Sequence, residues 1–365
     1  MHRGGNNLRR AGAIVACLIG AGFASGQEVV QFFSLYGGLR GALGACLACL
    51  VLAAACVWML GDASGRPVFV RWCGRPAGTL LQGAAPVFLF GVYAVMLSGA
   101  GAMLETASGL PAWVGRTFLL AATLATVWGG LTRMTELLGR LGPLIALFAV
   151  ATGAAALVWG PRTPQARPAL LPPARSWWMA ALLYAGYNFY LLVPFLQGMG
   201  QTVKRRGEAA RTALAACGIF GAALLLLHGG LTLCPGTMTS PAPAVALAAE
   251  LWPQAAWAAL PVLLAGVYTT AAPLLFGVSG SLGGSRKAML GAALAGWACS
   301  ALPFDRLVGG FFPVIGWFGL AMIACRAVTG AGHLLRCFLS REEPSAQGNG
   351  GTPRRTRQDT GWKCL

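Results

Sequence analysis

Charged residues are scarce in this sequence of 365 residues. Asp, Glu, Lys and Arg together make up 10% of the chain, whereas 56% of it is hydrophobic. A soluble domain has about a quarter of its residues charged, because it must cover its surface with polar groups. This chain lacks the polar surface of a soluble protein, and we therefore expect an all-α integral membrane protein with many transmembrane helices.

Several signatures of enzymes and nucleotide-binding proteins are also absent. The chain has 10 acids and no Asp-rich or His-Glu motif with which to build an intramembrane catalytic site. It has no P-loop, and Gly20-x-Gly22 lies in an apolar helix without a preceding strand, so this pattern does not predict a dinucleotide fold. The pair Cys46-x-x-Cys49 has no nearby histidine to complete a metal site. We expect no enzymatic activity and no bound cofactor.

The excess of basic residues does not predict nucleic-acid binding. The formal net charge is +17, but Lys and Arg lie in short gaps between apolar runs, and no soluble module exists to carry a basic stripe. They concentrate in every second gap and at both ends of the chain. By the positive-inside rule these segments are cytoplasmic. The pattern predicts ten spans in the cell (plasma) membrane, with both termini in the cytoplasm.

Ten apolar segments approach the length of about 20 residues that a transmembrane helix needs. They are Ala11–Phe33, Gly41–Leu60, Leu80–Leu104, Arg116–Leu131, Gly142–Trp159, Trp177–Met199, Thr212–Leu233, Ala255–Gly280, Ala288–Leu302 and Leu307–Cys325. The segment Ser240–Trp252 is ambiguous, and a short interfacial helix in an outer loop is one interpretation. The expected organisation is a cytoplasmic N-terminus (1–10), a five-helix repeat (11–159), an extracytoplasmic linker (160–176), a second five-helix repeat (177–330) and a basic polar tail, expected to be disordered (331–365).

The first helix of each half is interrupted by glycine and polar residues. In the first half the interruption lies between Gly20 and Glu28, and in the second between Tyr184 and Pro194. Each glycine weakens a helix by about 1 kcal/mol relative to alanine. Unwound backbone is tolerated inside a membrane where it lines a cavity, and two broken helices at matching positions indicate a transport site at the midplane.

The two interrupted helices supply the candidate site. Backbone groups, a hydroxyl, aromatic rings and an amide for binding a small organic solute come from Gly22, Phe23, Ala24, Ser25, Gly26, Tyr187 and Asn188. The carboxylate of an amino acid would favour free N–H groups of the first break, and its amine the free carbonyls. Glu28, with Gln27 beside it, is a candidate for coupling or gating, because an acid inside a membrane is costly and usually functional. Two alternatives stay open: Glu28 braces the broken backbone, or it is solvated at the interface.

The segment Ile19–Phe33, IGAGFASGQEVVQFF, resembles the opening helix of the YkvI-type membrane proteins. The stretch around Tyr187 and Asn188 is similar to the broken sixth helix of the same family. That family is grouped with the amino-acid/polyamine/organocation transporters. The resemblance therefore implies the LeuT-like fold, which is a five-plus-five inverted repeat with broken helices 1 and 6.

The eighth expected helix carries a candidate sodium site. The adjacent hydroxyls of Thr269 and Thr270 resemble the helix 8 part of the site in sodium-coupled relatives, in which backbone carbonyls of helix 1, here near Gly20, complete the shell. Hard cations prefer such oxygen ligands. The alternative is that both threonines bond back to their own helix. His228 in the seventh helix is a candidate proton site, although a packed neutral histidine is the more common case.

Together these features predict a secondary active transporter of a small organic solute, an amino acid or a related amine. Sodium or proton would drive it by alternating access. The expected partners are the solute and the lipid bilayer. A non-transporting sensor or a channel on the same fold is the alternative, because fold alone does not determine function, and an intramembrane enzyme is a more distant one.

Overall fold

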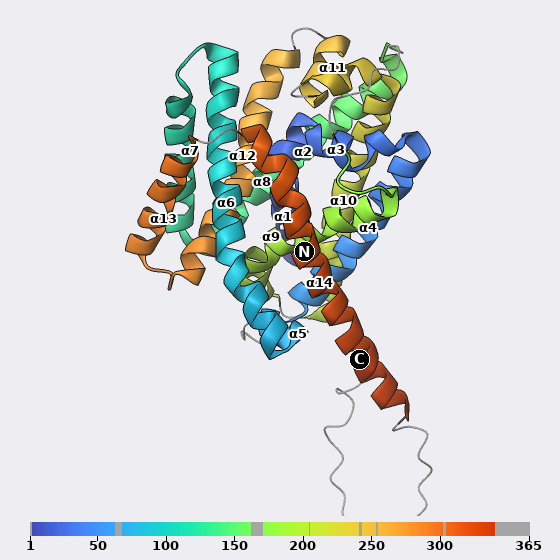
Figure 1. Cartoon of the computed structure of the whole chain (residues 1–365), viewed down its shortest axis with the longest axis vertical. Coiled ribbons are helices and arrows are strands. Elements are labelled where there is room, and N and C mark those ends of the chain that lie inside the picture. The colour runs from blue at the N-terminus through green and yellow to red at the C-terminus, as the bar shows by residue number, and fades with distance from the viewer. Residues whose placement is uncertain are drawn as a thin grey trace, which may run out of the picture.

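The computed structural model describes residues 2–62, 68–161, 171–203, 205–240, 243–252, 255–301 and 304–339. Within these ranges every regular element is a helix, as expected for an all-α membrane protein. The helices form one elongated bundle, from which the C-terminal end of the last helix projects (Figure 1). Part of the linker, residues 162–170, and the end of the tail, residues 340–365, lie outside the described residues.

A helix occupies each of the ten segments expected to cross the membrane. The first segment is divided into α1 (His2–Leu18), α2 (Ala21–Ser25) and α3 (Gln27–Phe32). The others are α4 (Gly38–Leu60), α6 (Arg75–Ser108), α7 (Ala112–Trp128), α8 (Gly130–Trp159), α9 (Trp177–Gly200), α10 (Arg206–Leu233), α12 (Ala255–Ser281), α13 (Arg286–Cys299) and α14 (Phe304–Leu339). Among the described residues, 7 helices are long and apolar enough to cross a membrane. The count of ten spans therefore stays a prediction.

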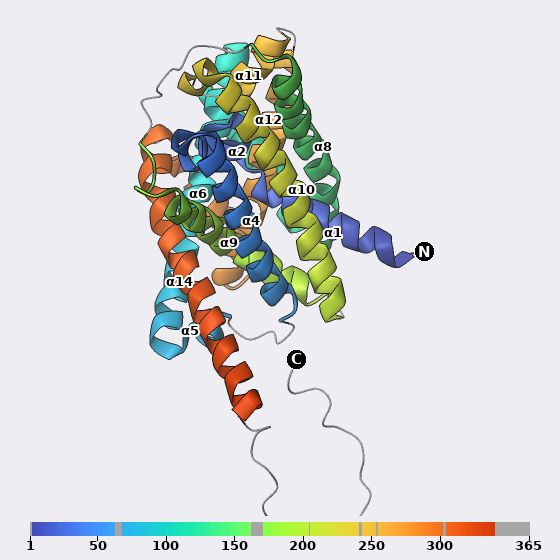
Figure 2. The same ribbon diagram turned by 90° about the vertical axis from the view of Figure 1, so that its right-hand side faces the viewer.

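Short helices lie between the long ones. The 3-10 helix η1 (Ser34–Tyr36) joins α3 to α4, and η2 (Pro235–Thr239) precedes α11 (Pro243–Leu251). The short helix expected in the ambiguous segment is confirmed by α11. A further short helix, α5 (Val68–Cys73), was not expected. In both views α11 and α5 lie at opposite ends of the bundle (Figures 1 and 2).

Glycines set how closely α1 packs against α8. A Cβ atom added at Gly12 would lie 2.8 Å from the carbonyl oxygen of Gly139. One added at Gly139 would lie 2.7 Å from the carbonyl oxygen of Arg9. Small residues let membrane helices approach until their backbones touch. This contact holds the buried part of α1, from Ala11 to Leu18, inside the bundle.

The expected break in the sixth helix is wrong: α9 runs as one helix from Trp177 to Gly200. Its glycine at position 186 serves close packing, because a Cβ there would overlap the backbone of Gly316 in α14. The side chain of Asn188 donates to the carbonyl of Tyr184, at 2.9 Å, and so bonds within the helix. Pro194 removes one backbone hydrogen bond without ending the helix.

Candidate substrate and ion site

The break in the first helix is built from two glycines. α1 ends at Leu18, and Gly20 has an extended backbone (φ −77°, ψ −174°) before α2 begins. Gly26 joins α2 to α3 with φ +85°, a conformation that favours glycine. A Cβ at Gly26 would also lie 2.7 Å from the backbone nitrogen of Ala244 in α11. The sequence therefore both breaks the helix and allows α11 to pack against the break.

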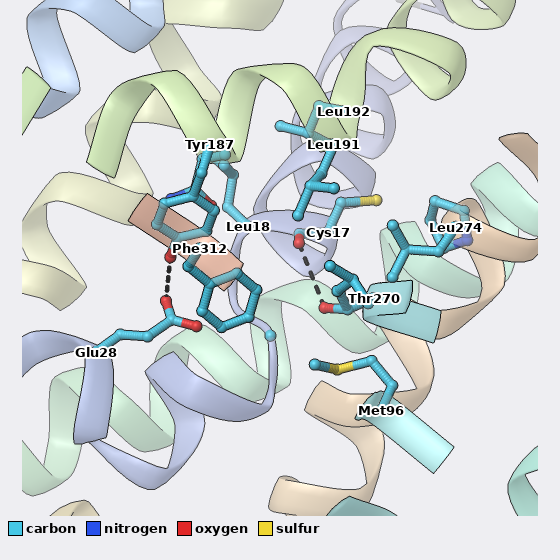
Figure 3. A pocket seen from close by; sticks show the side chains of 14 residues that line it. Cys17, Leu18, Glu28, Met96, Tyr187, Leu191, Leu192, Thr270, Leu274 and Phe312 are labelled. Atoms are coloured by element: carbon cyan, nitrogen blue, oxygen red, sulfur yellow. Dashed lines mark hydrogen bonds between the residues drawn. The ribbon is translucent and has the colours of Figure 1, made fainter. Parts of the chain in front are cut away.

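Glu28 folds back from α3 over α2. A Cβ at Gly22 would collide with the carboxyl group of Glu28, so glycine is needed there to accommodate it. The hydroxyl of Tyr187 in α9 donates a hydrogen bond to this carboxyl group (Figure 3). Glu28 is 5% exposed, and it is the one buried acid among the residues whose burial is described. No ion pair involves it within that part of the chain.

A small cavity lies beside Glu28, between the broken helix and α6, α9, α12 and α14. Its volume is about 30 Å³, room for one or two water molecules. Polar groups reach it from Glu28, Tyr187, Asn188 and Thr270, and apolar side chains such as Met96 form the rest of the wall (Figure 3). The ring of Phe312 in α14 stacks on that of Tyr187, with centroids 5.1 Å apart. Ligand pockets for organic molecules are about tenfold larger, so this conformation is closed.

The cavity brings together Gly20, Glu28, Tyr187, Asn188 and Thr270 from the expected site. Of the remaining expected residues, Thr269 lies in α12, and the others form the broken segment itself.

The ring of Phe23 packs on Phe220, with centroids 5.2 Å apart. The Ser25 hydroxyl donates to the carbonyl of Gly22 at 3.0 Å, and the backbone N–H of Gln27 donates to the Ser25 oxygen at 3.4 Å. Ala24 lies against α12: a Cβ atom added at Gly266 would be 3.2 Å from the Cβ atom of Ala24. These side chains shape the broken segment rather than the cavity wall.

Sequence reasoning missed the apolar part of the wall. Val92 and Met96 of α6, Leu274 of α12 and Phe312 of α14 line the cavity. They are ordinary apolar residues in apolar helices, and no local pattern distinguishes them from residues that face lipid. Their role follows only from long-range packing.

Oxygen atoms gather between the end of α1 and α12. The Thr269 hydroxyl donates to the carbonyls of Ala16, at 2.8 Å, and Gly266, at 3.0 Å. The Thr270 hydroxyl lies 3.4 Å from the carbonyl of Cys17, a long and weak bond, and it also faces the cavity (Figure 3). A site with hydroxyl and carbonyl oxygens suits a hard cation. Thr269 bonds within its own helix, as the alternative interpretation expects. It also bonds to the broken helix, next to the oxygens of the candidate sodium site.

His228 in α10 is buried and has a partner on each ring nitrogen. Its Nδ1 lies 2.9 Å from the Ser34 hydroxyl, and its Nε2 lies 2.9 Å from the carbonyl of Gly38. A carbonyl accepts only, so Nε2 carries a proton, and the serine hydroxyl can then donate to Nδ1. A neutral histidine satisfies both contacts, which fasten the turn between α3 and α4.

A broken first helix, a buried polar site beside it and an all-helical bundle are features of LeuT-like membrane transporters. Mhp1, a nucleobase-cation-symport-1 family transporter in a closed conformation with bromovinylhydantoin bound, has a similar structure: TM-score 0.59, 15% identity, covering 90% of this chain and 79% of that one. A Na⁺-coupled sialic acid symporter in a substrate-bound outward-open state gives a TM-score of 0.61 at 12% identity, covering 93% and 85%. The expected LeuT-like fold is confirmed. The inverted repeat stays a prediction.

Two known proteins of Bacillus subtilis (strain 168) are similar in sequence. The uncharacterized membrane protein YkvI is 22% identical over 329 residues, covering 87% of this chain and 94% of the relative. The uncharacterized protein YyaD is 24% identical over 330 residues, covering 86% and 93%. No protein-family model matches the chain. The resemblance to YkvI-type membrane proteins is confirmed, and it extends over most of the chain.

Proposed function

We propose that this protein is a secondary active transporter of a small organic solute, which binds at the broken first helix and moves by alternating access. The observation that carries the proposal is the buried carboxyl group of Glu28 beside the break, with no ion-pair partner in the described part of the chain. A charge in such a place is costly unless it is paired. Glu28 therefore exchanges between a proton and a cationic partner. Both solved structures compared above are transporters, in agreement with the expectation that the chain is not an enzyme.

The chemistry of the cavity favours an amine or an amino acid as the solute. Glu28 supplies an acceptor for an ammonium group, and the amide of Asn188 and the hydroxyl of Thr270 offer further polar contacts. The rest of the wall is apolar, which suits a short aliphatic or aromatic side chain. The solute thus carries its positive charge to the Glu28 side and its apolar part toward α6 and α14.

The coupling ion is sodium or a proton. Sodium would be held by the hydroxyl oxygens of Thr269 and Thr270 with the carbonyls of Ala16 and Cys17, after the hydroxyl hydrogens rotate away from those carbonyls. A proton would be held by Glu28 itself. The two alternatives predict different responses: sodium dependence removed by a change at Thr270, or pH dependence removed by a change at Glu28.

The closed cavity must open for a solute to enter. Phe312 and Tyr187 stack across it from α14 and α9, so separating these two rings is the smallest movement that enlarges it. Opening toward the other end requires α1 to leave α8, where Gly12 and Gly139 now bring the backbones together. The broken first helix allows such rocking without unfolding a whole span.

The test is thermal unfolding of the full-length protein in detergent, with amino acids, amines and nucleobases added in sodium or in potassium at two pH values. A ligand at a hundred times its Kd stabilises by about 2.7 kcal/mol. Asn188→Ala should remove the shift, whereas Ser25→Ala should retain it, because Asn188 lines the cavity and Ser25 does not. Loss of the shift in both variants, or in neither, would contradict the site.

Uptake into proteoliposomes separates transport from sensing. A solute that stabilises the protein should accumulate when the sodium or proton gradient is applied, and not without it. Binding without uptake would indicate a sensor on the same fold. If no solute shifts the unfolding temperature under any ion, the transporter proposal fails.

A further inference from the structure

A second cavity lies far from the break, at the end of the bundle that carries α5. It has a volume of about 430 Å³, against about 30 Å³ at the break. Its walls come from the C-terminal end of α4, from α5, from the start of α10 and from α14. Figure 2 shows α14 and α5 side by side at this end. The cavity is within the size range of sites for small molecules.

Positive charge dominates this cavity. Arg71, Arg206 and Arg326 line it, with Asp62 as the one acid among its lining residues. Asp62 forms an ion pair with Arg71 and accepts a hydrogen bond of 3.2 Å from the indole N–H of Trp72. The negative charge of Asp62 is therefore already neutralised by Arg71, and the guanidinium of Arg326 adds positive charge to the same cavity.

Arg326 is held in position by aromatic rings. Its guanidinium carbon lies 5.6 Å from the centroid of the Trp58 ring and 5.8 Å from that of Trp72. In the part of the chain that the structure describes, no carboxylate forms an ion pair with it. Cation–π contacts fix the guanidinium in place and leave its charge uncompensated.

The nearby positive charge changes the pKa of Arg71. Burial and the nearby Arg326 guanidinium lower the pKa of Arg71, which lies in α5 between two expected spans. An anion in the cavity would relieve this repulsion. Planar guanidinium groups form paired hydrogen bonds with phosphate oxygens, and arginine is the usual residue where such geometry matters.

We propose that this cavity is an anion site that binds a phosphate group through Arg71, Arg206 and Arg326, with Trp58 and Trp72 as its apolar wall. The phosphate belongs either to an anionic phospholipid of the adjacent leaflet or to a soluble phosphate compound. Basic pockets between transmembrane helices at a cytoplasmic surface suit lipid headgroups. The site is independent of the proposed transport, since none of its residues lines the cavity at the break.

The test uses the full chain in detergent without any solute, so that its outcome does not depend on the transport proposal. Thermal unfolding is followed while inorganic phosphate is added, with chloride of equal ionic strength as the reference. A second series adds phosphatidylglycerol to the micelles, with phosphatidylcholine as the reference. We expect a saturable rise of the unfolding temperature in at least one series.

Arg326→Gln should shift the half-saturating anion concentration upward by about tenfold or more, the effect of losing one charge-assisted hydrogen bond. Arg140→Gln is the matched control: it removes the same charge from an exposed position outside the cavity, and it should leave the titration unchanged. If Arg326→Gln does not fold, Arg326→Lys retains the charge but not the paired geometry and should weaken binding by a smaller factor.

The two series distinguish the sources of the phosphate. A response to phosphatidylglycerol alone assigns the site to a lipid headgroup, and a response to inorganic phosphate alone assigns it to a soluble compound. Saturation in neither series, or equal weakening by Arg326→Gln and Arg140→Gln, would overturn the proposal.

Discussion

Glu28 is the residue on which the proposed coupling depends. Glu28→Gln keeps the size of the side chain and an oxygen that can accept the Tyr187 hydrogen bond, but it removes the charge and the titrating proton. An ammonium solute should then bind about ten- to a hundredfold more weakly, because a charge-assisted hydrogen bond is worth about 1.5–3 kcal/mol. In the wild type, binding should weaken as pH falls and Glu28 is protonated, whereas the variant should show no such pH dependence. Ligand titrations at several pH values measure both effects.

Tyr187→Phe is the companion variant. It removes the donor to Glu28 and leaves the ring that stacks on Phe312. A buried polar group without its partner costs about 1–3 kcal/mol, so the unfolding temperature should fall in the variant. In the double variant with Glu28→Gln the loss should be smaller than the sum of the two single losses, because both changes remove the same interaction. An additive loss in the double variant would show that the two side chains do not interact.

Residue by residue, the sequence predicted the polar members of the cavity better than the apolar ones. Glu28 and Thr270 were predictable because polar groups inside apolar membrane helices are costly and usually have a function. Phe312 and Met96 were not, because an apolar residue in a membrane helix looks the same whether it faces lipid or a cavity. Ser25 was predicted as a binding residue, but its hydroxyl bonds to the helix that carries it.

At the scale of elements, α9 is the helix whose conformation differs from the prediction, and Gly186 tests the reason. A Cβ at this position would overlap the backbone of α14, so Gly186→Ala should push the two helices apart and cost about 1–3 kcal/mol. Gly218→Ala in α10 is the matched control. An added Cβ there meets nothing within 4 Å, and alanine should stabilise the helix by up to about 1 kcal/mol. Thermal unfolding compares the two, and an equal response would show that Gly186 is not packed against α14.

The two interrupted helices show why one break was predictable and the other was not. The first contains Gly20, Gly22 and Gly26 within seven residues, enough to weaken a helix whatever surrounds it. The second depends on Gly186, and a single glycine serves either a break or a close contact. Its partner, Gly316, is far away in the sequence, so the choice is made by tertiary packing.

For the whole molecule, composition was sufficient to predict the class, and the spacing of apolar segments predicted the order of the helices. It did not predict α5, because six residues in a gap between spans are too few to show a helical period. The large cavity beside α5 therefore had no sequence signal either. Its arginines were interpreted only as residues that set orientation, and their common site depends on four elements that meet in space.

Orientation in the membrane is the remaining property of the whole molecule that the charge pattern predicts, and α10 offers a direct test. This helix has 28 residues, about 42 Å along its axis, which is long enough to place its two ends on opposite sides of a bilayer. Gly207 near its start and Thr239 just beyond its end are both exposed, and each is changed to cysteine in a variant whose native cysteines are replaced by alanine. With both termini cytoplasmic, an impermeant maleimide added to intact cells should label the Thr239→Cys variant and not the Gly207→Cys variant, and permeabilised cells should label both. The reverse pattern would place the basic cavity outside the cell and contradict the predicted orientation.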